Sequence, residues 1–389
     1  MEIILDDISY SLPSSLLMKK NDMLTISHNG LLDEIPDFES VIEGKFNSSD
    51  LLKYHFRTDF KFFNKLLLQI HNRRKLKLSD KQLFNLLRFL SIGYLNSNDV
   101  RYFNEFLWFY RSKGSFPDLK KIVLHNFKSN LDEKNTHSIP YFTKTKINSY
   151  ISKLNSQANK HIKTNNNVKL RVGLIGIPFI LKKIYSRLVN NKFPVSVFVV
   201  PYFKELKRRF FLKSGFVFKA FNRLNGVRFS YKVLNYHHHD QKIKELLLKE
   251  NLDIGFFKLG FIVKDNIYDA FNIGLLHDHL AVLPFVRGRS SIEFSLLIGV
   301  PVGSTIHLIG RGIDTGAIVK VYTYDVQKGE DINSIRKKIK KDFENRIYDS
   351  LEKISKNSCK YMNNDTSKGL TYYSIHPALK NFINRSILK

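Results

Sequence analysis

The chain has 389 residues, 43% of them hydrophobic, so it is long enough for two domains and apolar enough to bury a sizeable core. A single cysteine, Cys359, excludes a disulfide framework and a cysteine-rich zinc site. The formal net charge of +28 favours phosphate-bearing or otherwise anionic partners. The alternative is a global compositional bias toward lysine, asparagine, isoleucine and phenylalanine, whose lysines would give the same charge without any such partner.

The N-terminal sequence, MEIILDDISY, carries acidic residues where a signal peptide requires basic ones. No apolar run approaches the roughly 20 residues of a membrane-spanning helix. We therefore expect a cytoplasmic protein.

Residues 1–126 are predicted to form a mainly helical region that begins with one short strand, Glu2 to Leu5. Phe56, Phe60 and Phe63 recur at helical spacing, and Ser79 to Gln82 is a capping-box signature that opens a second helix. A third helix begins near Asn98. The apolar stripes of the last two helices are Leu83, Leu86, Leu87 and Leu90, and then Phe103, Phe106, Leu107 and Tyr110. We interpret these stripes as core rather than as a cofactor site.

Residues 127–167 are polar, end in Thr-Asn-Asn-Asn and are predicted to be a linker. From residue 168 the pattern becomes strand, turn, helix, strand: Val168 to Ile175, a helix to about Asn190, and Pro194 to Val200. This is a βαβ unit and predicts an α/β domain, residues 168–325, with a mostly parallel, Rossmann-like sheet. The first turn lacks the glycine-rich phosphate fingerprint, which disfavours dinucleotide binding.

The most basic stretch runs from Lys204 to Lys232 and interleaves phenylalanines with lysines and arginines. It is either an amphipathic surface segment or a site that grips phosphates, in which case Lys207, Arg208 and Arg209 are candidates for binding an anionic substrate or RNA. The following run, residues 237–240, is His-His-His-Asp. Because it has no metal-ligand spacing, we interpret it as a solvated turn.

The stretch from Gly274 to Val319 carries the chemistry. On a strand, His277 and His279 share one face while Asp278 points to the other. A second strand, Ser304 to Ile309, and a glycine-rich loop with Asp314 follow. Two histidines and one aspartate at strand ends and loops are a plausible catalytic constellation.

Four motifs in this stretch resemble, in order and spacing, those of the folate-dependent formyltransferase superfamily, which includes methionyl-tRNA, glycinamide ribonucleotide and sugar N-formyltransferases. The motifs are Leu283-Pro284, Arg287-Gly288, Gly303-Ser304-Thr305-Ile306-His307 and Gly312-Ile313-Asp314-Thr315-Gly316. The chain departs from the family pattern at three positions, with His277 for asparagine, Ala281 for serine and Gly310 for the first aspartate of the loop.

The resemblance implies catalytic roles for His277, His279 and Asp314, with 10-formyltetrahydrofolate as formyl donor and no resident metal. It also implies a set of cofactor-binding residues, namely Leu283, Pro284, Arg287, Gly288, Gly312 and Gly316. Formyl transfer passes through an oxyanion, which the family stabilises with an asparagine amide and a histidine. We expect His277 to donate one N–H in place of that amide.

Three hypotheses remain open. The first is an active N-formyltransferase that acts on an amine of an anionic small molecule. The second keeps the fold but uses a metal held by His277, His279 and Asp314, which have the composition of a two-histidine, one-carboxylate site. The third is a catalytically decayed protein that binds nucleic acid or another anionic ligand.

Residues 326–389 are predicted to be a C-terminal helix and tail. Ile335, Ile339, Phe343, Ile347 and Leu351 recur at a constant spacing of four, which predicts one helix from near Asp331. The tail is too short for the barrel domain that follows the catalytic domain in tRNA formyltransferases. This favours a small-molecule acceptor over tRNA.

Overall fold

A computed structural model describes the parts of the chain that carry the α/β region and most of the predicted helices. The described residues are 2–5, 8–11, 37–45, 61–97, 99–110, 123–125, 127, 149, 151–152, 160–161, 169–199, 223–224, 226–233, 241–258, 263, 265–356 and 359–388. The predictions for Lys207, Arg208 and Arg209, for the histidine run 237–240 and for most of the linker lie outside these residues.

The N-terminal region is helical, as predicted, and its helices pack around aromatic side chains. It contains the hairpin β1 (Glu2–Leu5) and β2 (Ile8–Ser11), and the helices α1 (Phe38–Glu43), α3 (Lys61–Asn72), α4 (Asp80–Ser97) and α5 (Val100–Tyr110). The capping box is confirmed, because the Ser79 amide donates to Gln82 Oε1 and the Gln82 amide to Ser79 Oγ. Phe89, Tyr94 and Phe103 are fully buried between α4 and α5.

A seven-stranded sheet forms the centre of the molecule, in the order β11-β10-β8-β7-β4-β5-β6. The strands are β4 (Val172–Gly176), β5 (Val195–Val199), β6 (Lys232–Val233), β7 (Ile254–Lys258), β8 (Gly274–His279), β10 (Gly303–Leu308) and β11 (Ile318–Thr323). From β6 to β8 neighbouring strands are parallel, whereas β10 and β11 pair antiparallel at one edge. The mostly parallel sheet is confirmed.

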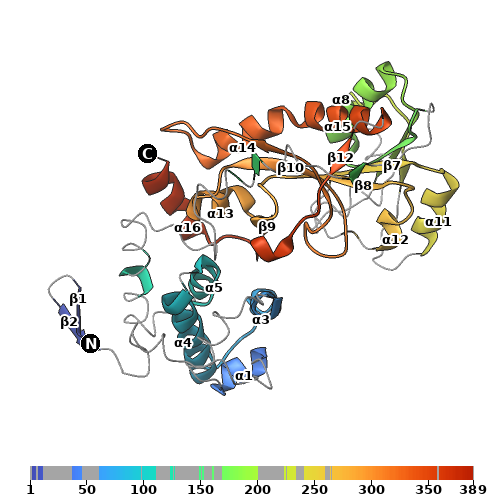
Figure 1. Ribbon diagram of the computed structural model, residues 1–389. Helices are drawn as coiled ribbons and strands as arrows, with labels where there is room; N and C mark the ends of the chain where they lie inside the picture. Colours follow the sequence, from blue (N-terminus) through green and yellow to red (C-terminus); the bar gives the residue numbers. More distant parts are fainter. Residues whose placement is uncertain are drawn as a thin grey trace.

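Helices cover both faces of this sheet (Figure 1). On one face, α8 (Pro178–Asn190) and α15 (Phe343–Ser355) pack over Leu174, Phe256 and Leu276. On the other, α11 (Gln241–Lys249) and α12 (Asp265–Tyr268) pack over Phe257 and Leu275. The alternation of Leu275 and Leu276 between the two cores fixes which way every later side chain of β8 points.

The single helix predicted from Asp331 is wrong, because the structure has two. They are α14 (Ile332–Lys341) and α15, with Asp342 between them at φ −95° and ψ 9°. A spacing of four drifts by about 40° per step around a helix of 3.6 residues per turn, so one straight helix would carry Leu351 far from the face of Ile335. The break at Asp342 returns Ile347 and Leu351 to the sheet, where both are fully buried.

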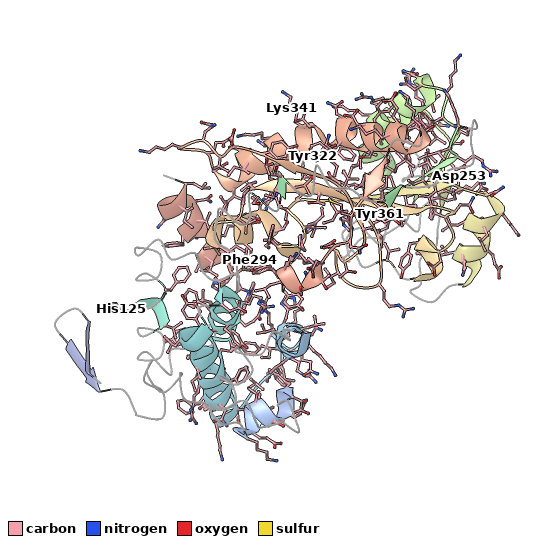
Figure 2. All side chains as sticks on the ribbon, viewed as in Figure 1. His125, Asp253, Phe294, Tyr322, Lys341 and Tyr361 are labelled. Atoms are coloured by element: carbon pink, nitrogen blue, oxygen red, sulfur yellow. The ribbon has the colours of Figure 1, made fainter. Side chains whose placement is uncertain are left out.

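The C-terminal segment returns to the region around β9 (Val286–Gly288) and α13 (Ser291–Leu297). It consists of β12 (Lys360–Tyr361), which pairs with β3 (Lys160–His161), then η3 (Thr366–Lys368), β13 (Leu370–Tyr372), α16 (Pro377–Phe382) and η4 (Ile383–Ile387). Strand β13 pairs in parallel with β9. Residues from α4, α5, α13 and this segment share one hydrophobic core. Phe294, labelled in Figure 2, belongs to it, and its ring lies tilted against that of Tyr372 with the centroids 4.6 Å apart.

The same segment also contacts the N-terminal helices through polar groups. The carbonyl of Ser374 accepts hydrogen bonds from Arg74, Asn104 and Trp108, and the His376 amide donates to Asn104. The domain boundaries at 126, 167 and 325 stay predictions. Among the helices described, none is both long and apolar enough to cross a membrane.

Candidate active site

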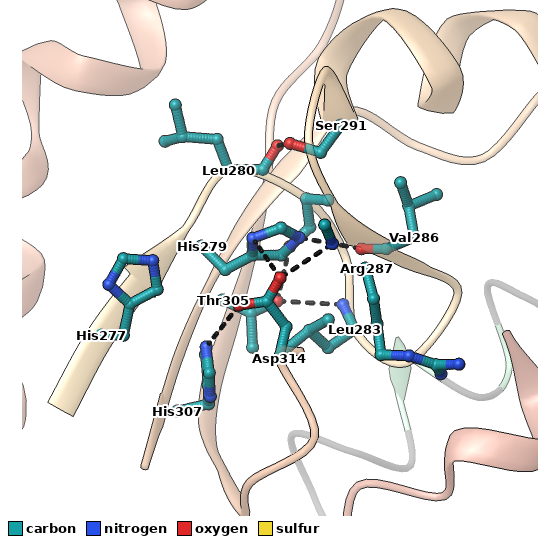
Figure 3. A network of polar contacts seen from close by, with 12 residues as sticks. His277, His279, Leu280, Leu283, Val286, Arg287, Ser291, Thr305, His307 and Asp314 are labelled. Atoms are coloured by element: carbon teal, nitrogen blue, oxygen red, sulfur yellow. Dashed lines mark hydrogen bonds and ion pairs between the residues drawn. The ribbon is translucent and has the colours of Figure 1, made fainter. Parts of the chain in front are cut away.

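Strand β8 presents different chemistry on its two faces, as the alternation of side chains predicts. His277 and His279 lie on the same side as Leu275, and Asp278 lies on the side of Leu276 and α15. Figure 3 shows the first side, where the two histidines and Asp314 converge at the carboxyl end of β8. The predicted convergence is therefore confirmed as geometry.

Behind the strand, Asp278 is enclosed by cations. Its carboxylate, with 2% of the residue exposed, accepts from Arg346 at 2.8 Å, lies 3.4 Å from Lys258 Nζ and accepts from the Ser304 hydroxyl. Burial would raise the pKa of Asp278, but Lys258 and Arg346 lower it below its usual value. This is a satisfied internal ion cluster.

Strand β10, which lies beside β8 in the sheet, supplies further residues of the site. In the antiparallel register, His307 lies opposite His277 and Thr305 opposite His279. The Thr305 hydroxyl donates to the Ala281 carbonyl at 2.7 Å and accepts from the Leu283 amide at 3.1 Å. Thr305 therefore fixes the loop that leaves the carboxyl end of β8.

The glycine-rich loop positions Asp314 in a conformation that few residues adopt. Asp314 has φ 51°, in the left-handed region. A side chain on Gly316 would place its Cβ 1.8 Å from the Leu308 carbonyl oxygen, so the loop can lie this close to β10 only with glycine there. Asn364, from the C-terminal segment, donates to the carbonyls of Asp314 and Gly316 and holds the loop in place.

The Asp314 carboxylate is the meeting point of the site. Oδ2 accepts from the Gly288 amide at 2.8 Å and lies 3.3 Å from His279 Nδ1, while Oδ1 lies 3.6 Å from His307 Nε2. Burial by itself would raise the pKa of Asp314, but His279 and His307 outweigh it and hold the pKa well below its usual range. The carboxylate is therefore ionised at neutral pH.

The hydrogen bond of His277 contradicts the role expected from the sequence. His277 Nδ1 lies 3.0 Å from the Phe257 carbonyl, which can only accept, so Nδ1 carries the proton of the neutral ring. Burial, together with the neighbouring His307, lowers the pKa of His277 to about 4, so the ring is neutral near pH 7. Its Nε2 then has no proton and carries a lone pair that can only accept. His277 does not offer the site an N–H in place of an amide, because that N–H is given to Phe257.

The predicted cofactor-binding residues lie around this centre, and their role stays a prediction. Leu283 and Arg287 are buried, and Gly288 turns the chain at φ 90°. The Arg287 guanidinium donates to three backbone carbonyls, those of Pro284, Thr366 and Gly369. Arg287 therefore ties the motif to the C-terminal segment.

Sequence reasoning did not assign two residues that the structure brings to the site. His307 is the last residue of the Gly-x-Thr-x-His motif, so its position in that motif was an available signal. Asn364 follows Asp314 by 50 residues and belongs to no motif, so no local pattern indicates it.

A groove lies elsewhere in the molecule. It encloses about 1140 Å³ between α3, α5 and Ser374, and is lined by His71, Arg74 and Trp108 among others. None of these residues belongs to the motifs. We therefore identify the candidate active site by the residues that meet at Asp314, and not by the position of this groove.

The sequence of the α/β region matches a known family. Residues 175–351 match the family described as Formyl transferase, a span that contains β8, β10 and Asp314. The α/β region is therefore similar in sequence to the formyltransferase superfamily.

Relatives of the formyltransferase region match short segments. The methionyl-tRNA formyltransferase of Finegoldia magna is 38% identical over 84 residues, which are 21% of this chain and 27% of the relative. That of Borreliella burgdorferi is 30% identical over 119 residues, 30% of this chain and 38% of the relative. The chain thus spans well under half the length of these relatives.

Solved structures show a distant likeness. A 4-N formyltransferase from Francisella tularensis is 17% identical with a TM-score of 0.42, and covers 55% of this chain and 86% of its own. Glycinamide ribonucleotide transformylase 1 from Symbiobacterium toebii is 20% identical with a TM-score of 0.39, and the match covers 50% of this chain and 93% of that protein. At such TM-scores the fold assignment rests on the strand order described above.

Proposed function

We propose that the chain transfers a formyl group from 10-formyltetrahydrofolate to an amine of an anionic small molecule. The observation that carries the proposal is the contact between His279 and Asp314, 3.3 Å apart at the two family positions that the catalytic residues occupy. The family match over residues 175–351 supports the same reaction.

In this reaction the amine nitrogen attacks the formyl carbon, negative charge develops on the formyl oxygen and positive charge on the amine. The bond from the formyl carbon to N10 then breaks, and the amine proton leaves with the folate nitrogen. The ionised Asp314 would stabilise the cationic amine. It also orients the ring of His279, whose Nε2 donates to the Val286 carbonyl at 2.8 Å.

The acceptor is inferred from charge. A formal net charge of +28 favours an acceptor that carries phosphate or another anionic group. The curated relatives are methionyl-tRNA formyltransferases, so a nucleic-acid acceptor is the alternative that the assay must distinguish.

The first test measures binding of 5-formyltetrahydrofolate by calorimetry. The second incubates the protein with 10-formyltetrahydrofolate and either glucosamine 6-phosphate or methionyl-tRNA, and follows formylation by mass spectrometry. The matched pair of variants is His279→Ala and His125→Asn, the latter an exposed histidine outside the matched region. Folate binding in the unmodified protein, with formylation that is lost in His279→Ala and kept in His125→Asn, supports the proposal. Absence of folate binding in the unmodified protein contradicts it.

A further inference from the structure

Three histidine rings at the site are held in the same manner. His277 Nδ1, His279 Nε2 and His307 Nδ1 each lie 2.8–3.0 Å from a backbone carbonyl, those of Phe257, Val286 and Leu308. A carbonyl can only accept, so each of these nitrogens carries a proton. In its neutral form each ring therefore directs a lone pair from its second nitrogen into the site.

Those second nitrogens are not hydrogen-bonded closely to Asp314. The distances of 3.3 Å from His279 Nδ1 and 3.6 Å from His307 Nε2 exceed the roughly 2.7–2.9 Å of a charge-assisted hydrogen bond. His307 is 2% exposed, and its Nε2 is buried without a hydrogen-bond partner. A divalent cation held between the carboxylate and the second ring nitrogens would be attracted by both.

We propose that His277 Nε2, His279 Nδ1 and Asp314 together bind a four-coordinate divalent transition-metal ion of the Zn²⁺ kind. The three ligand atoms lie within 4.8 Å of one another. With bonds of about 2.1 Å, two ligands of a tetrahedral ion are about 3.4 Å apart. The pair of His279 and Asp314 already has that separation, at 3.3 Å.

The ligand types and their surroundings both select this class of ion. Imidazole with a carboxylate suits zinc and iron, whereas Mg²⁺ and Ca²⁺ prefer sites made of oxygen. Metal-binding histidines almost always donate their other ring N–H to a carbonyl or carboxylate, which fixes the tautomer. Here Phe257 and Val286 supply those carbonyls. The Gly288 amide holds Asp314 Oδ2, leaving Oδ1 as well as the free lone pairs of Oδ2 for coordination.

The site does not depend on the proposed function, but its role in catalysis rests on it. The family stabilises the oxyanion with an asparagine amide that this chain replaces with His277. A bound ion would polarise the formyl oxygen instead, while the amine nitrogen bonds to the formyl carbon, the bond to N10 breaks and the amine proton passes to N10. In that case the ion held by His277 would stabilise the oxyanion in place of the family's asparagine amide.

The test uses the full chain and two readouts other than activity. Protein stripped with a chelator is titrated with Co²⁺ and its visible spectrum recorded, and Zn²⁺ affinity is measured by competition with a coloured chelator. The expected result is about one Co²⁺ per chain with the intense bands of a four-coordinate ion. In addition, Zn²⁺ affinity should fall at least about tenfold in His277→Asn and stay unchanged in His125→Asn.

The unmodified protein keeps the test decisive if a variant fails to fold, because a Co²⁺ spectrum of the weak, six-coordinate type overturns the site by itself. Equal Zn²⁺ affinity in folded His277→Asn overturns it as well. The two proposals fail separately. Metal-free protein that binds 5-formyltetrahydrofolate and formylates its acceptor at full rate removes the metal and keeps the function. Protein that binds Co²⁺ as expected but does not bind folate keeps the site and removes the function.

Discussion

Each face of β8 has a carboxylate near cationic or ionisable partners, a buried one at Asp278 and a partly buried one at Asp314, yet the two have different partners. Asp278 is matched by Arg346, Lys258 and the Ser304 hydroxyl. Asp314 has one short hydrogen bond, from the Gly288 amide, and faces imidazole nitrogens at 3.3 and 3.6 Å. A carboxylate with fixed, fully charged partners holds a fold together, whereas one with neutralisable partners and a strained backbone is available for chemistry.

The comparison predicts that Asp278 matters most for stability. Asp278→Ala leaves the buried Arg346 and the partly buried Lys258 without their anion and should destabilise the protein by about 3–5 kcal/mol. Urea denaturation measures this loss. Ser304→Ala is the control, since it removes a hydroxyl donor and should cost about 1 kcal/mol. Equal losses in both variants would show that the charge of Asp278 is not what stabilises the fold.

Asp314 should show the opposite division between activity and stability. Asp314→Asn keeps an acceptor for the Gly288 amide but loses the ionised form that its lowered pKa shows to be favoured in the folded protein, so the free energy of unfolding should fall, by less than in Asp278→Ala. The specificity constant for formyl transfer should fall about 100-fold or more, equivalent to about 3 kcal/mol of barrier. The double variant with His279→Ala should lose little beyond either single variant, because the two act as a unit. Multiplying losses would instead mean independent roles.

The third prediction concerns the effect of His277 on how stability depends on pH. Its pKa falls from 6.5 to about 4 on folding, so between these values the unfolded chain binds a proton that the folded chain does not. Stability should therefore decrease as the pH falls from 6.5 to 4. His277→Asn should remove about 1–3 kcal/mol of that decrease, as measured by urea denaturation at several pH values. His125→Asn should keep the original slope, and an unchanged slope in His277→Asn would mean that His277 titrates normally.

The smallest effect is expected for the basic stretch from Lys204 to Lys232. Replacing Lys207, Arg208 and Arg209 together with alanine should raise the KM for an anionic acceptor about threefold to tenfold, because exposed ion pairs contribute little individually. Folate affinity should not change. The effect should disappear at high salt, which screens exposed charges over about 8–10 Å at physiological strength. A KM that is insensitive to both changes would assign the basic stretch to general surface charge.

Local patterns were enough to predict much of this site. Alternation along β8 placed His277 and Asp278 on opposite faces, and the motif spacing brought His279 to Asp314. The first prediction depends on short-range geometry that a strand imposes on any sequence, whereas the second followed from the resemblance to the family. The capping box at Ser79 is confirmed for the same reason.

The remaining features depend on contacts that no local pattern encodes. The tautomer of His277 is set by the Phe257 carbonyl, a backbone atom that every residue possesses. Asn364 reaches Asp314 from 50 residues away. The break at Asp342 separates Ile335 and Ile339, which pack in one hydrophobic core, from Ile347 and Leu351, which pack in another, and a constant spacing of four does not show this division.

The contacts of the segment from Asn364 to His376 determine when the site can assemble as the chain is synthesised. This segment holds the glycine loop through Asn364, pairs with β9 beside the Gly288 amide and bonds to α5 through Ser374. Because a chain is made from its N-terminus, the helices of the first region and the motifs of β8 leave the ribosome long before the segment that joins them. Asp314 therefore gains its full set of supports only after residue 376 has emerged, and a nascent chain stalled before that point would contain every catalytic candidate without an assembled site.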